Sequence, residues 1–179
     1  MTQPLHDPRV ATLRHDFDAA FARPPAERAE ESEDLLAVRI AGDAFAIRLR
    51  DIDGVVANRR VVPFPGGHSD CLGVAGIRGL TVPVFDLAAL LGYGAGGEAP
   101  QWMVLSGRDD AIALAFDDFD GYLRLPRSSF RVEEKLRSTR PHVTEVASTA
   151  AGVLAVIGLP PLVAMIRNRA GRARLVKEH

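Results

Sequence analysis

The residue types best suited to catalysis occur together in one short stretch, His68-Ser69-Asp70-Cys71. Histidine, aspartate and a serine or cysteine are the components of a nucleophilic triad, and a histidine beside a cysteine favours a thiolate. Catalytic groups converge from separate segments of a chain, however, whereas neighbours along an extended chain point apart. We therefore interpret residues 68–71 as a polar loop before a buried strand and expect no catalytic residue there.

Glycines at positions 73, 76 and 79 follow directly, with the spacing G-x-x-G-x-x-G that invites comparison with phosphate-binding loops. A P-loop needs Gly-Lys-Ser/Thr ahead of a helix, and the dinucleotide fingerprint needs G-x-G-x-x-G at a strand-to-helix turn. Here the strand-like residues 80–85 follow and the motif contains no lysine. We predict that these glycines allow tight turns and close backbone approach.

The carboxylates of Asp117, Asp118 and Asp120 resemble part of a calcium loop. They lack the bidentate glutamate that closes such a loop, so a solvated turn between two strands is the better interpretation. The five histidines have no zinc-ligand spacing, and Cys71 is the sole cysteine, which excludes an internal disulfide. We expect no metal, no cofactor and no enzymatic activity.

The composition is that of a globular protein, with 47% hydrophobic residues and a net charge of −1 over 179 residues. Such a balance provides no uniform field for nucleic acid or an anionic membrane. The longest uncharged stretch, residues 150–166, is shorter than the roughly 20 residues of a membrane helix. The N-terminus has no apolar signal region, so we expect a cytoplasmic protein without direct membrane insertion.

Short apolar runs separated by glycine or polar turns predict about ten strands and no long helical crossover. Asp86 can cap a short helix that stops at Gly92, and Pro160 with Pro161 begins a last helix. This rhythm indicates small barrels rather than a parallel α/β sheet. The expected strands are 35–40, 44–49, 52–57, 60–64, 73–77, 80–85, 102–106, 111–116, 121–125 and 153–157.

Both ends of the chain lie outside this rhythm. Residues 1–34 are predicted to be an extension with one amphipathic helix, since Val10, Leu13, Phe17 and Phe21 fall on one helical face. That face either folds onto its own domain or binds a partner. Residues 171–179 are predicted to be a basic tail, which is either solvated or bound to an acidic partner surface.

With the barrel rhythm in place, residues 70–92, DCLGVAGIRGLTVPVFDLAALLG, resemble the signature of the CheW family of chemotaxis coupling proteins. The agreement extends over residues 35 to about 168 and includes the hairpin LLAVRIAGDAFAIRL. The string most specific to the family is matched by Gly73, Val74, Arg78, Gly79, Pro83, Asp86 and Leu87. The resemblance implies a CheW-like domain at residues 35–170, made of two five-stranded, Src-homology-3-like barrels on a shared core.

The resemblance also implies a non-catalytic adaptor that couples methyl-accepting chemoreceptors to a CheA-like histidine autokinase. Carried over by position, the surface facing the receptor signalling tip includes Leu49, Val55 and Arg78. The surface facing the regulatory domain of the kinase includes Ile52, Val61 and Gly73.

Some positions depart from the family pattern. Gly54 stands where glutamate is common, Gly76 where asparagine is usual, and Ala88 where arginine is common. The Gly54 departure and the N-terminal extension motivate a second hypothesis, a competitor or regulator that binds only one of the two partners. For Arg78 itself, the alternative to docking is a local role, bonding the ends of its own strand pair.

Overall fold

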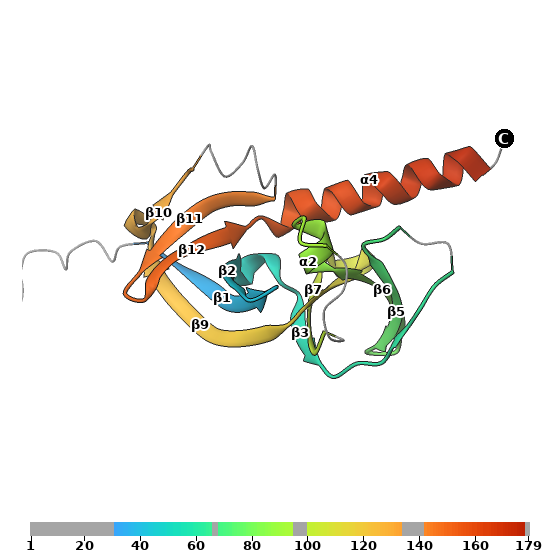
Figure 1. Cartoon of the computed structure of the whole chain (residues 1–179), viewed down its shortest axis with the longest axis horizontal. Helices are drawn as coiled ribbons and strands as arrows, with labels where there is room; N and C mark the ends of the chain where they lie inside the picture. The colour runs from blue at the N-terminus through green and yellow to red at the C-terminus, as the bar shows by residue number, and fades with distance from the viewer. Residues whose placement is uncertain (1–30, 66–67, 95–99, 134–141, 178–179) are drawn as a thin grey trace, which may run out of the picture. The chain divides into compact units, whose positions relative to one another are not determined.

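Two β-sheets of six strands each make up most of the described chain (Figure 1). The computed structural model describes residues 31–65, 68–94, 100–133 and 142–177. The predicted amphipathic helix of the N-terminal extension lies outside these residues. The predicted mainly β architecture is confirmed.

The first sheet has the order β10-β11-β12-β2-β1-β9 and the second β3-β7-β8-β6-β5-β4. The first contains β1 (Ser32–Ile40), β2 (Asp43–Arg48), β9 (Asp118–Pro126), β10 (Phe130–Arg131), β11 (Val143–Thr149) and β12 (Gly152–Ile157). The second contains β3 (Gly54–Ala57), β4 (Val61–Val62), β5 (Cys71–Ile77), β6 (Leu80–Asp86), β7 (Trp102–Ser106) and β8 (Ile112–Phe116). The helices are η1 (Leu49–Asp51), α2 (Leu87–Leu90), η2 (Arg108–Asp110), η3 (Arg127–Ser129) and α4 (Leu159–Lys177).

Each sheet is rolled into a barrel, because its two outermost strands are consecutive in sequence. Opposite edges of a flat six-stranded sheet would be roughly 24 Å apart. The link from Ala57 in β3 to Val61 in β4 spans at most about 14 Å. Residues 127–129 join β9 to β10 in the same way. The closing strand of each barrel is thus split in two, so six strands appear where five were expected.

The two barrels share one topology. In each, two antiparallel hairpins are joined by a parallel pair of strands, β12 with β2 in the first barrel and β6 with β8 in the second. Helix α4 follows β12, and helix α2 follows β6. The second barrel, β3 to β8, is inserted between the two halves of the first barrel.

A shared apolar core joins the barrels, as predicted. Phe45 and Ile47 of β2, Leu114 of β8 and Leu159 and Leu162 of α4 belong to one buried cluster. Each such side chain contributes about 1.5–3 kcal/mol when it is withdrawn from water. Two smaller clusters fill the individual barrels, one around Met103 and Val84 and the other around Leu35 and Val156.

Several elements differ from the sequence expectations, among them β9, which begins at Asp118 rather than at residue 121. Strand β11 was not predicted, because Thr144, Ser148 and Thr149 give it a loop-like composition although Val143, Val146 and Ala147 are buried. Strand β1 already begins at Ser32, and α4 continues to Lys177 through most of the segment that was expected to be a basic tail.

Candidate docking surface

The arginine of the glycine-rich segment occupies the tip of the β5–β6 hairpin. Ile77 pairs with Leu80, so Arg78 and Gly79 form a two-residue loop. Both residues have positive φ, 52° and 80°, which is characteristic of a type I′ turn. An L-residue other than glycine or asparagine pays about 1–2 kcal/mol for this conformation. The turn thus presents an arginine where local backbone energetics favour a different residue.

The side chain of Arg78 crosses from this hairpin to the beginning of β3. A Cβ atom on Gly54 would lie 2.9 Å from Nη2 of Arg78 and 3.7 Å from Cδ1 of Leu105. Arg78 is exposed, and within the described ranges it makes no hydrogen bond or ion pair. The local alternative, in which Arg78 bonds the ends of its own strand pair, has no such bond among the described residues to support it.

Acidic side chains near Gly54 in sequence are engaged elsewhere. Asp53 accepts a hydrogen bond from the backbone N–H of Arg108, with 2.7 Å between the atoms. Asp51 is partly buried, and its carboxylate lies 4.0 Å from Arg50; burial raises the pKa of this carboxyl.

Several charged residues of the first barrel are paired, unlike Arg78. Glu33 is almost buried and pairs with Arg48 at 3.2 Å, Arg50 at 2.8 Å and Arg127 at 3.3 Å. On the surface, hydrogen bonds from Arg124 and Tyr122 lower the pKa of Asp34 to about 2.

The other two residues assigned to the receptor surface lie near the connection between the barrels. Leu49 is in η1 and Val55 in β3, and both are exposed large apolar side chains. Successive residues of a strand point to opposite faces, so the side chain of Val55 faces away from the side of Gly54 on which Arg78 lies. The side chains of Arg78 and Val55 therefore lie on opposite sides of strand β3.

The three residues assigned to the kinase surface differ in exposure. Ile52 is partly buried against the shared core, and Val61 is partly buried against the second barrel. Gly73 is buried with φ 139°, and a Cβ atom there would lie 2.1 Å from the carbonyl oxygen of Val62. Gly73 therefore lets β4 approach β5 closely.

Sequence reasoning missed the exposed apolar residues beside these positions. Val62 is 53% exposed on the edge strand β4, Phe64 is 63% exposed after it, and Leu80 is 63% exposed beside the Arg78 turn. Their exposure depends on which strands lie at the sheet edges, so no local pattern would have identified them.

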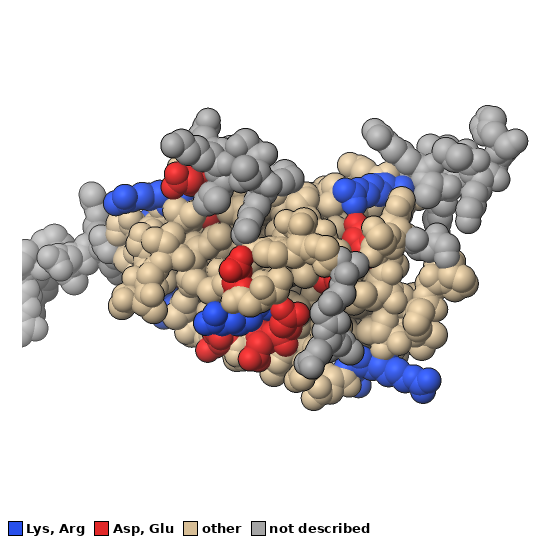
Figure 2. All heavy atoms as spheres, in the orientation of Figure 1, with Lys and Arg blue, Asp and Glu red and all other residues tan. Residues whose placement is uncertain are grey.

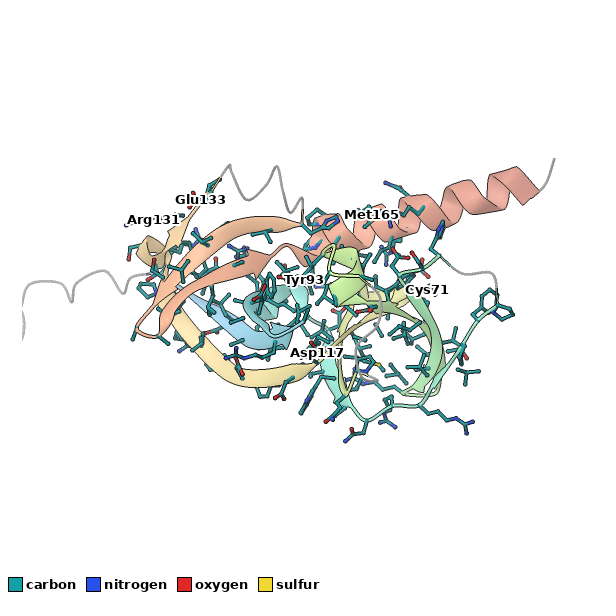
Figure 3. All side chains as sticks on the ribbon, viewed as in Figure 1. Cys71, Tyr93, Asp117, Arg131, Glu133 and Met165 are labelled. Atoms are coloured by element: carbon teal, nitrogen blue, oxygen red, sulfur yellow. The ribbon has the colours of Figure 1, made fainter. Side chains whose placement is uncertain are left out.

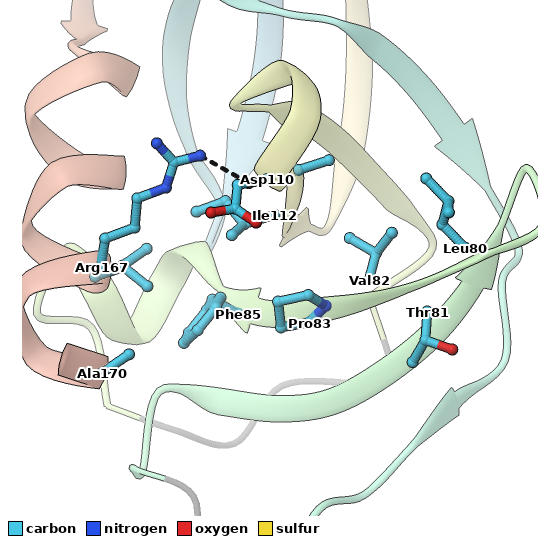
Figure 4. Close-up of a pocket in the computed structure, with 11 residues that line it drawn as sticks. Leu80, Thr81, Val82, Pro83, Phe85, Asp110, Ile112, Arg167 and Ala170 are labelled. Atoms are coloured by element: carbon cyan, nitrogen blue, oxygen red, sulfur yellow. Dashed lines mark hydrogen bonds between the residues drawn. The ribbon is translucent and has the colours of Figure 1, made fainter. Parts of the chain in front are cut away.

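A pocket of about 620 Å³ adjoins the same hairpin, between β6, the start of β8 and α4 (Figure 4). Its lining is mainly apolar and includes Leu80, Pro83, Phe85 and Ile166. Arg167 of α4 donates to the carbonyl oxygen of Asp110 at 2.7 Å, which holds the helix against the β7–β8 connection.

The groups considered first for catalysis do not converge on one another. Asp70 pairs with Arg169 at 2.8 Å, and the Sγ atom of Cys71, at the start of β5 (Figure 3), faces the carbonyl oxygen of Gly73 at 4.0 Å. Asp117 accepts from the N–H of Ala41, whereas Asp118 and Asp120 lie in β9, so the connection between the strands is shorter than the expected turn.

Acidic side chains lie around a basic one on the face seen in Figure 2. Arg39 and Asp120 form an ion pair at 2.9 Å. Among the described residues, no group of three histidine, cysteine or acidic side chains is placed to hold a metal ion. No helix in the described part of the chain is both long and apolar enough to span a bilayer.

Comparison with known proteins places this geometry in context. A family model described as the CheW-like domain matches residues 34–166. The crystal structure of the scaffolding protein TtCheW from Thermoanaerobacter tengcongensis is similar, with a TM-score of 0.65 and 17% sequence identity. The match covers 72% of this chain and 90% of that chain, and at this identity it supports the fold alone. No curated protein matches.

Proposed function

Because the chain belongs to the family of CheW-like domains, we propose that it is a non-catalytic adaptor of chemosensory signalling. It binds the signalling tip of a methyl-accepting chemoreceptor and the regulatory domain of a CheA-like histidine autokinase, so that receptor state alters kinase autophosphorylation. The phosphoryl chemistry belongs to the kinase. The protein is cytoplasmic and is recruited to membrane receptor arrays through these partners.

The observation that carries this proposal is the exposed Arg78, which lies on the β3 edge without a carboxylate partner in the described part of the chain. Arginine anchors protein interfaces well, because its stem packs on apolar neighbours and its planar fork binds carbonyl or carboxylate groups. Leu49 of η1 and Val55 of β3 add exposed apolar area. We assign these three residues to receptor binding.

The kinase surface centres on Ile52, Val61 and Gly73. Gly73 acts through the backbone, by letting β4 pack closely, while Val62 and Phe64 supply the exposed apolar area. Small apolar patches with polar rims suit assemblies that form and reorganise.

Binding of the purified full chain to both partners tests the proposal. Calorimetric titration is carried out with a chemoreceptor signalling-tip fragment and, separately, with the kinase regulatory domain. Binding of both supports the adaptor, and binding of one favours the competitor hypothesis. Binding of neither contradicts both. Arg131→Gln is a suitable control, since Arg131 is exposed in β10 of the first barrel (Figure 3).

A further inference from the structure

The guanidinium of Arg78 lies against backbone rather than against an acid. Its Nη2 and Cζ atoms lie 2.9 Å and 3.6 Å from the position that a Cβ atom on Gly54 would occupy. No carboxylate in the described ranges lies within ion-pair distance of it. Asp53, the adjacent acid, is engaged by the backbone N–H of Arg108.

This arrangement leaves the donor fork available to a bound partner. Arginine binds a carboxylate through two parallel N–H···O bonds, and such charge-assisted bonds are stronger than neutral ones. Leu80, 63% exposed, directly follows the turn. A partner carboxylate beside an apolar side chain complements this combination in both charge and polarity.

We infer that Arg78 binds a carboxylate contributed by the partner, and that Gly54 determines this specificity by leaving the guanidinium unpaired. The inference rests on the proposed function, because the partner is the signalling tip of the chemoreceptor. The chain then selects receptors that carry an aspartate or glutamate at the contact.

Gly54 has this role because any side chain there would contact Arg78. The contact is with the far end of a flexible side chain, and Gly54 is not among the residues with positive φ, so other residues fit the backbone. A glutamate at position 54 would supply an internal carboxylate that pairs with the guanidinium of Arg78. A glutamine would fill the same space without the charge.

The experiment compares Gly54→Glu with Gly54→Gln in the full chain. Each variant is titrated with a recombinant chemoreceptor signalling-tip fragment, after urea unfolding has shown that it folds. We expect Gly54→Glu to weaken binding about tenfold or more, as when a hydrogen bond to a charged group is lost. Gly54→Gln should stay within about threefold of the wild type.

A second measurement does not depend on these variants. Acidic residues of the receptor fragment are changed singly to asparagine or glutamine and combined with Arg78→Gln in double-mutant cycles. We expect one receptor acid whose loss has little further effect once Arg78 is replaced.

Equal affinities for the glutamate and glutamine variants, or no receptor acid coupled to Arg78, would overturn the inference while wild-type binding left the proposed function standing. Failure of the wild-type chain to bind any receptor fragment would overturn the proposed function, and the inference with it.

Discussion

Arg169 of α4 donates a hydrogen bond to Asp70, 99 positions earlier in the sequence, with 2.8 Å between Nη1 and Oδ2. Asp70 is 8% exposed, and its carbonyl oxygen also accepts from the N–H of Asp86. The pair thereby attaches the last helix to both ends of the β5–β6 hairpin that carries Arg78. An acid that first suggested a catalytic triad thus has a structural partner.

Removal of Arg169 should therefore destabilise the fold. Arg169→Gln leaves the buried Asp70 carboxylate without its cation, and we expect a loss of about 1–3 kcal/mol in the free energy of unfolding. Urea denaturation measures this, with Asn168→Ala on the exposed side of the same helix as the control. Equal stability of the two variants would mean that the ion pair contributes nothing.

Stability should also fall in mildly acidic solution because of His142. Burial lowers the pKa of His142 below its ordinary value of 6.5, and the nearby charge of Arg169 lowers it further. The unfolded chain therefore takes up a proton near pH 6.5, whereas the folded chain does so only at lower pH. The contribution of neutral His142 is complete above that pH and is lost as the pH falls from there through the folded-state pKa.

His142→Gln should reduce this pH dependence, which unfolding curves at several pH values would reveal. Asp34, with its pKa lowered to about 2, acts in a separate window, below its ordinary value of 3.8. An unchanged slope below pH 6.5 in the variant would assign the effect to other groups.

Gly73 and Gly76 lie in the same strand, but an added methyl group should destabilise the fold strongly at Gly73 and very little at Gly76. At Gly73 a Cβ atom would lie 2.1 Å from the carbonyl oxygen of Val62 and φ is 139°, so Gly73→Ala should cost several kcal/mol. At Gly76 nothing lies within 4 Å, so Gly76→Ala should stay within about 1 kcal/mol of the wild type. Thermal unfolding of the pair measures the difference, and comparable losses would show that β4 does not require Gly73.

Replacement of Arg78 by asparagine should separate stability from binding. Asparagine is favoured at this position of a type I′ turn, so Arg78→Asn should raise the free energy of unfolding by about 0.5–1 kcal/mol. Receptor affinity should fall at the same time, by about 2 kcal/mol for an interface anchor. Urea unfolding and receptor titration of one sample test both. A variant that is destabilised as well as weakened would indicate a structural role for Arg78.

Local sequence patterns predicted the features that depend on neighbouring residues. The hairpin with Arg78-Gly79 as its turn is present, and Asp86 caps α2 by accepting from the N–H of Ala88 at 2.9 Å. Turns and helix caps are determined by residues a few positions apart, so they can be predicted from the sequence.

Local sequence patterns could not predict the features that depend on how the strands close into barrels. The contact of Arg78 with Gly54 arises because the hairpin tip meets the first residue of an edge strand formed much earlier in the chain. The exposure of Val62 and Phe64 and the burial of Gly73 likewise depend on the position of β4 at a sheet edge. Strand β11 was missed because its polar residues hide a buried face.

We propose that this chain couples receptors to a kinase. Autophosphorylation of the histidine kinase from labelled ATP, measured with receptor signalling fragments and with or without the full chain, tests that coupling most directly. We expect kinase activity to respond to the receptor only when the chain is present, and Arg78→Asn to weaken the response. A receptor response of equal size without the chain would contradict the proposal.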